Sequence, residues 1–210
     1  MPQDSQAILF YVHDPMCSWC WAFAPTWAEI KQNLPEHIKV RYLLGGLAPD
    51  SNEPMPSAMQ AAISGYWQTI MQKVPGTQFN FDFWEKCEPR RSTYPSCRAV
   101  IAARNQDVTK ELPMISAIQH GYYLNAMNPS DDSTLVTLAS EIGLNSTQFE
   151  KDLNSLDTQN QLIEEINMGR AIGAQGFPSL ILKTPKGYQY LPHDYNDATF
   201  TLSRLSKLAL

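Results

Sequence analysis

The 210-residue sequence has no long hydrophobic run and no concentration of positive charge. Its first apolar stretch, Ala7 to Val12, is far too short to span a bilayer. No basic segment with a long apolar stretch opens the chain, as it would in a signal peptide. We therefore expect a cytoplasmic protein that does not bind or span a membrane. The net charge of -5 comes without clustered Lys and Arg, which argues against a nucleic-acid partner.

The pattern of a metal site is missing as well. The histidines are scattered at His13, His37, His120 and His193, and no two have metal-ligand spacing. Cys17 and Cys20 form a close pair, but Cys87 and Cys97 are too far apart to complete a zinc site. We expect no metal, and a zinc knuckle is the less favoured interpretation. In a reducing compartment structural disulfides are rare, so a close pair indicates catalysis or metal binding.

A strand–helix–strand unit surrounds the close cysteine pair. The apolar run from Ala7 to Val12 predicts a buried strand. A mostly apolar stripe with helical spacing follows from Trp21 to Leu34, and Pro35 ends it. Residues 38–44 predict a second strand. Such a unit implies a parallel strand pair with a right-handed crossover.

The rest of the chain divides into a helical block and a mixed end. Residues 48–56 contain three prolines and predict a linker after the second strand. Helical patterns then follow one another to residue 157 without a strand signal, and Ser57 with Gln60 resembles a capping box that opens the first of these helices. A helix from about residue 157 then leads to strands at 179–183 and 188–191, which we expect to pair as a hairpin before a last helix.

The segment Cys17-Ser18-Trp19-Cys20 lies where the first strand passes into a helix. Unpaired N–H groups and the helix dipole stabilise an anion at a helix start, which favours the thiolate of the first cysteine. Thiolate is the attacking species in disulfide exchange. A cysteine one turn later is close enough to resolve a mixed disulfide. We therefore assign two catalytic residues, Cys17 as nucleophile and Cys20 as resolving thiol.

Several features together resemble the thioredoxin superfamily and, within it, the DsbA-like, FrnE-type thiol–disulfide oxidoreductases. The first feature is the order of a strand, a Cys-x-x-Cys motif and a helix. The second is Pro25, five residues beyond Cys20, and the third is Gly176-Phe177-Pro178 directly before a strand. The segment from Ser92 to Arg98 also resembles part of the helical insertion of these proteins, although Ser92 and Cys97 stand where relatives have Asn and His.

This resemblance implies an α/β, thioredoxin-like fold with a large all-helical insertion. Residues 1–47 plus 158–210 would form the thioredoxin-like domain, and residues 48–157 the insertion. The insertion would cover part of the active-site face, with Thr93 to Arg98 as the best candidates for contact. Cys87 and Cys97 are interpreted as core thiols, with a role for Cys97 near the redox pair as the alternative.

The resemblance also implies a substrate-binding loop. In this family the Phe177–Pro178 bond is cis and faces the redox pair, so the backbone of Phe177 is free to pair with a substrate peptide. Without the redox pair, an ordinary trans proline would be preferred. Trp19 is either an apolar platform for substrate or a residue packed on the insertion. Asp14 is interpreted as a turn residue, with a carboxylate acting on Cys17 as the alternative.

The leading functional hypothesis is dithiol–disulfide exchange, as a protein disulfide oxidoreductase or isomerase. The partners would be protein or peptide thiols and disulfides. No metal or organic cofactor is expected, and glutathione is a candidate electron partner. One alternative is a glutathione-dependent transferase or isomerase of the kappa type, although those relatives carry Ser at the position of Cys17. The other is a non-catalytic peptide-binding module.

Overall fold

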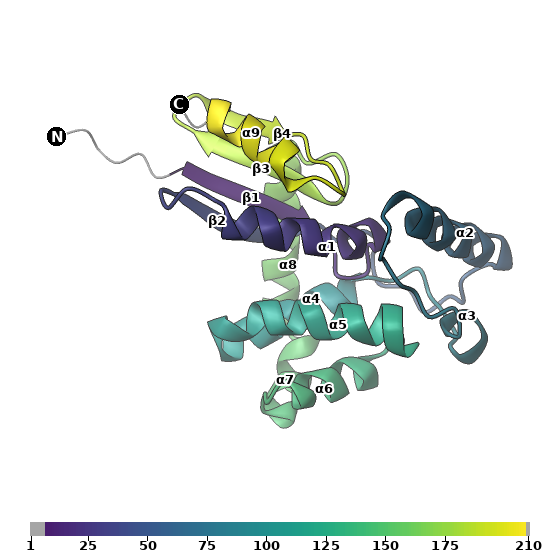
Figure 1. The fold of residues 1–210 in the computed structure, drawn as a ribbon. Coiled ribbons are helices and arrows are strands. Elements are labelled where there is room, and N and C mark those ends of the chain that lie inside the picture. Colours follow the sequence, from purple (N-terminus) through teal and green to yellow (C-terminus); the bar gives the residue numbers. More distant parts are fainter. Residues whose placement is uncertain (1–6, 209–210) are drawn as a thin grey trace.

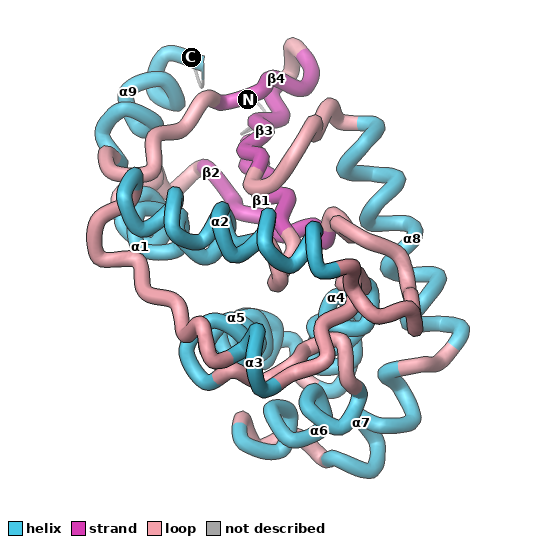
Figure 2. The backbone as a smooth tube through the Cα atoms, turned by 90° about the vertical axis from the view of Figure 1, so that its right-hand side faces the viewer, coloured by secondary structure: helices cyan, strands magenta, loops and turns pink. Residues whose placement is uncertain are grey.

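The computed structural model describes residues 7–208, which form a four-stranded sheet with helices on both faces and further helices at one end (Figures 1 and 2). The strands are β1 (Ala7–His13), β2 (Ile38–Leu44), β3 (Ser179–Thr184) and β4 (Gly187–Leu191). The sheet order is β2-β1-β3-β4, with β1 parallel to β2 and antiparallel to β3. The predicted parallel pair and the β3–β4 hairpin are therefore confirmed.

The two faces of the sheet are covered by different helices (Figure 2). Successive strand side chains point to opposite faces, so Leu9 and Tyr11 pack with α1 (Ser18–Gln32) and α9 (Ala198–Leu208). Phe10 and Val12 pack instead with Met168, which belongs to α8 (Leu156–Ala171). The cysteine pair follows the carboxyl end of β1. The remaining helices lie beside this end of the sheet.

Those remaining helices gather beside that end of the sheet (Figure 1). They are α2 (Ser57–Lys73), α3 (Phe83–Lys86), α4 (Tyr94–Gln106), the 3-10 helix η1 (Val108–Lys110), α5 (Glu111–Asn125), α6 (Asp132–Glu141) and α7 (Ser146–Leu153). Their main core includes Leu162 and Ile166 of α8 and Leu44 of β2. The helix α8 thus packs against the sheet and also against the other helices. The predicted division of the chain into two domains at residue 157 stays a prediction.

The capping-box prediction for α2 was wrong. The helix begins at Ser57, and Pro56 is its N-cap. The carbonyl of Pro56 accepts hydrogen bonds from the backbone of Met59 and Gln60, and the Gln60 side chain donates to the carbonyl of Met55 at 2.8 Å. Because Ser57 is already inside the first turn, its hydroxyl does not serve as the cap. Within residues 7–208, no helix is both long and apolar enough to cross a membrane.

Candidate active site

The cysteine pair lies at the start of α1, as predicted. Cys17 is the N-cap residue, and its backbone N–H donates to the carbonyl of Asp14 at 3.0 Å, which closes a turn after β1. Cys17 is 6% exposed, whereas Cys20, in the first helical turn, is 0% exposed. Both are free thiols. Cys17 is therefore the less buried of the two and the one that lines the adjacent cavity.

The surroundings of Cys20 keep its thiol protonated. Burial raises the pKa of Cys20 well above its ordinary value, and the neighbouring Cys17 raises it further through a hydrogen bond and its charge. A hydrogen bond from the backbone of Asp14 acts in the opposite direction. A buried cysteine with a raised pKa is a poor first nucleophile, and it becomes reactive only when its neighbour holds a mixed disulfide.

The loop before β3 lies against the cysteine pair. The Phe177–Pro178 bond is cis, as expected, and the thiol of Cys17 lies 3.5 Å from the carbonyl oxygen of Phe177. The ring of Phe177 fits against Gly45, where a Cβ atom would lie only 2.0 Å from the ring atom Cε1. Glycine directly after β2 therefore lets the loop approach. Pro178 itself is buried.

A cavity of about 730 Å³ opens beside Cys17. Cys17, Trp19 and Phe177 line it from the thioredoxin-like part of the chain, and Met59 and Tyr66 of α2 line it from the insertion. The expectation that the insertion covers part of the active-site face is confirmed. Pro178 is absent from the lining residues that the structure describes. The predicted binding of substrate by Pro178 therefore stays a prediction, and so does pairing of a substrate with the Phe177 backbone.

Trp19 packs on the insertion, as one of its two interpretations predicted, and its role as a platform for substrate stays a prediction. Its half-buried side chain packs against Ile70 and Val74 of the insertion, and its ring centroid lies 5.0 Å from that of Tyr195. The same residue lines the cavity beside Cys17. The packing holds the ring in place, and the remaining exposed surface is available as an apolar wall for a ligand.

Asp14 does more than the turn interpretation predicted. One carboxylate oxygen accepts from the Met16 backbone at 2.8 Å, which is the expected turn contact. The other accepts from the Leu47 backbone at 2.7 Å and from the Thr93 hydroxyl at 2.6 Å. Burial raises the pKa of Asp14, and these hydrogen bonds oppose that shift. The thiol of Cys97 lies 3.5 Å from the same oxygen, so Cys97 is a buried core thiol that also contacts the active-site turn.

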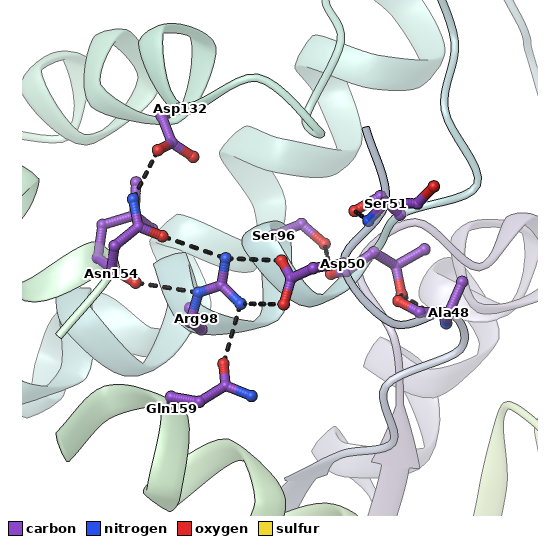
Figure 3. Close-up of polar contacts among 11 residues, drawn as sticks. Ala48, Asp50, Ser51, Ser96, Arg98, Asp132, Asn154 and Gln159 are labelled. Atoms are coloured by element: carbon purple, nitrogen blue, oxygen red, sulfur yellow. Dashed lines mark hydrogen bonds and ion pairs between the residues drawn. The ribbon is translucent and has the colours of Figure 1, made fainter. Parts of the chain in front are cut away.

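Within the segment expected to contact the active-site face, Thr93 lines the cavity and bonds to Asp14, whereas Arg98 bonds elsewhere. Its guanidinium is bidentate to Asp50, with both N–O distances 2.8 Å, and also donates to Gln159 at the start of α8 (Figure 3). Its Nε donates to the carbonyl of Leu153 at 3.1 Å. A buried cation needs such partners. Arg98 therefore joins the linker after β2 to α7 and α8, and this long-range role has no local signal in the sequence.

Other residues of the site were not singled out from the sequence. Arg90, Arg91 and Arg170 line the cavity. An isolated arginine carries no pattern that would assign it to a cavity formed by distant segments. Cys87 is half-buried, donates to the carbonyl of Ala126 at 3.0 Å, and does not line the described cavity.

The fold and the paired cysteines define a thioredoxin-fold protein with a Cys-x-x-Cys site. A family model described as thioredoxin matches residues 10–190, and the chain belongs to this family. The fold with its helical insertion is that of the DsbA-like disulfide oxidoreductases.

Solved structures cover almost the entire chain. A putative protein disulfide isomerase from Nitrosomonas europaea is 25% identical with a TM-score of 0.83, covering 96% of this chain and 97% of that one. The cytosolic disulfide reductase DsbM from Pseudomonas aeruginosa is 21% identical with a TM-score of 0.77, covering 96% and 98%. DsbM has also been solved with GSH.

Curated relatives carry a different description. The ClpXP adapter protein SpxH of Bacillus subtilis is 22% identical over 200 residues, which are 90% of this chain and 65% of the relative. SpxH of Halalkalibacterium halodurans is 23% identical over 146 residues, which are 68% of this chain and 47% of the relative. The chain thus spans less than two thirds of each curated relative.

Proposed function

We propose that the protein carries out dithiol–disulfide exchange through Cys17 and Cys20. The observation that carries this proposal is the asymmetry of the pair. Cys17 is the N-cap of α1 and lines a cavity beside the carbonyl of Phe177, while Cys20 is fully buried behind it. This arrangement suits one cysteine for attack and the other for resolution.

In the reducing direction, the Cys17 thiolate attacks a substrate disulfide. A bond forms between the Cys17 sulfur and one substrate sulfur, and the other substrate sulfur leaves as a thiolate and takes a proton. Cys20 then loses its proton and attacks the Cys17 sulfur, which releases the second substrate thiol. Two electrons have passed to the substrate, and the protein holds a Cys17–Cys20 disulfide. Two glutathione molecules reduce that disulfide and become glutathione disulfide.

Several observations support the choice of partners. The GSH complex of DsbM supports glutathione as the electron partner. The Phe177 backbone beside Cys17 supports a peptide substrate that pairs with the loop. Isomerisation of a misformed disulfide would use the same mixed disulfide at Cys17. The description of DsbM as cytosolic supports a cytoplasmic location.

Insulin reduction in a glutathione buffer tests this proposal. We expect turnover by the wild-type protein, none by Cys17→Ser, and full turnover by Cys87→Ser, which serves as the control because Cys87 does not line the described cavity. Circular dichroism establishes that the variants are folded. Equal turnover by wild type and Cys17→Ser would overturn the proposal.

A non-catalytic peptide-binding module is the second candidate. The two curated relatives described as adapter proteins favour it, and so does the cavity wall formed by Met55, Met59 and Ile63. The double variant Cys17→Ser/Cys20→Ser separates the two functions. If this variant binds peptides as tightly as the wild type, and the wild type shows no turnover of any disulfide, the binding function is the correct one.

A further inference from the structure

The cavity beside Cys17 is positively charged, although the chain carries a net charge of -5. Arg90, Arg91 and Arg170 line it, and no Asp or Glu occurs among its lining residues within the described chain. Arg90 is paired with Asp131 at 2.5 Å and also donates to the carbonyl of Ser130. Its charge is therefore already balanced, and the excess charge of the cavity comes from the other two arginines.

Arg91 and Arg170 have no partner of opposite charge within residues 7–208. Both are exposed. Arg91 belongs to the insertion, just before α4, and Arg170 lies in the last turn of α8. Arg91 lies close to Tyr122, another residue that lines the cavity. Burial raises the pKa of Tyr122, and the positive charge of Arg91 opposes this rise.

The cavity also has the size and the apolar surface of a small-ligand site. Its volume of about 730 Å³ falls in the range of pockets that bury most of a small molecule. Met16, Trp19 and Met59 provide apolar walls around the Cys17 opening. A ligand that fits these features is short, has a sulfur for Cys17, and carries negative charge for the arginines.

We propose that Arg91 and Arg170 select short cysteine peptides with carboxylates next to the cysteine. Unpaired guanidinium groups bind carboxylates through charge-assisted hydrogen bonds, and a cavity lined by one sign of charge raises the local concentration of the opposite ion. This inference rests on the proposed disulfide exchange and assigns its substrate class. Neither arginine takes part in the sulfur chemistry.

The test compares disulfide-linked dimers of three tripeptides, Glu-Cys-Glu, Gln-Cys-Gln and Lys-Cys-Lys, with blocked ends. The reduced protein is mixed with each dimer, and the rate of oxidation of Cys17 and Cys20 is followed by acid quenching and mass spectrometry. At low salt we expect the acidic peptide to react about tenfold faster than the basic one, with the neutral peptide between them. Added salt should reduce this ratio, because exposed charges are screened.

The variants Arg91→Gln and Arg170→Gln should each slow the acidic peptide about threefold relative to the neutral peptide. The double variant should bring the acidic-to-basic ratio close to one. Lys186→Gln removes the same charge from an exposed turn outside the described cavity lining, and it should leave the ratio unchanged. A uniform loss of rate on all peptides would indicate a structural effect and would overturn the proposal.

Failure of this inference is distinguishable from failure of the proposed function. Equal wild-type rates on the three peptides, with Cys17 and Cys20 becoming oxidised, would overturn the charge selection and leave disulfide exchange standing. If neither these peptides nor a small neutral disulfide such as hydroxyethyl disulfide oxidised the pair, disulfide exchange itself would fail. An equal effect of Lys186→Gln and the arginine variants would show that net charge, and not the cavity, sets the preference.

Discussion

The Thr93 hydroxyl donates a 2.6 Å hydrogen bond to the carboxylate of Asp14. Asp14 precedes Cys17 by three residues, and Thr93 is the N-cap residue of α4 in the insertion. The same hydroxyl accepts from the backbone of Ala48 at 3.0 Å. Both side chains are buried. This one contact therefore joins the active-site turn, the linker after β2 and the helical insertion.

Thr93→Val should destabilise the protein by about 1–3 kcal/mol, because it leaves the Ala48 N–H and one Asp14 oxygen short of a buried hydrogen bond. Thr93→Ser keeps the hydroxyl and is the matched control, with a smaller loss. Urea unfolding gives both values. Equal losses for the two variants would show that the methyl group, and not the hydroxyl, is the important part of Thr93.

Gly45→Ala should displace the Phe177 ring, since the new Cβ would meet it at 2.0 Å. We expect kcat/KM for peptide disulfides to fall severalfold, because the Phe177 carbonyl lies beside Cys17. The control is Gly65→Ala in α2, where a Cβ meets no atom within 4 Å. That variant should keep its activity and gain about 0.5–1 kcal/mol of stability. Unchanged activity in Gly45→Ala would contradict the loop's role.

Cys20→Ser should accumulate a mixed disulfide at Cys17, because the resolving thiol is missing. Mass spectrometry after incubation with glutathione disulfide would show a single added glutathione in this variant and an internal disulfide in the wild type. In the reduced wild-type protein, iodoacetamide should label Cys17 faster than Cys20, which is fully buried. The reverse order of labelling would show that the two roles are assigned wrongly.

His13 should make the fold sensitive to acid. Burial lowers its pKa from the ordinary value of 6.5 to about 3, and neither ring nitrogen has a hydrogen-bond partner within the described chain. Below pH 6.5 the unfolded chain binds a proton that the folded chain does not bind, so the stability contributed above that pH is lost as the pH falls toward 3. At pH 5 this loss amounts to about 2 kcal/mol.

The variant His13→Phe removes that loss and keeps an aromatic ring, which stacks 5.1 Å from Tyr11 in the wild type. The raised pKa of Asp14 acts with the opposite sign in both proteins, since protonation of the folded state adds stability as the pH falls. The difference between the two proteins therefore isolates His13. Urea unfolding at pH 7.5 and 5 measures it, and identical pH dependence would refute the assignment.

Trp19→His should raise the reduction potential of the Cys17–Cys20 pair. A histidine cation beside the pair stabilises the thiolate and therefore the reduced form, whereas tryptophan carries no charge. Proteins with this motif span about -270 to about -120 mV, and we expect the wild type nearer the lower end. Equilibration in glutathione buffers measures both values. Trp19→Phe is the uncharged control, and an equal shift in that variant would rule out a charge effect.

Local patterns in the sequence were sufficient for the framework and for the reactive pair. A continuous apolar run marks β1, and the Cys-x-x-Cys motif directly after it marks the start of α1. The hairpin of β3 and β4 follows from two short strands separated by a turn. These features depend on residues that are neighbours in the chain, so their composition and spacing predict them.

Contacts between distant segments required the tertiary structure. Asp14 and Thr93 are 79 positions apart, and Arg98 meets Asp50 and Gln159 from 48 and 61 positions away. The positive charge of the cavity likewise depends on Arg91 and Arg170, which approach Cys17 only after the insertion has packed against α8. A single residue without a periodic pattern does not reveal its partners in the sequence, because the packing of whole helices decides which side chains meet.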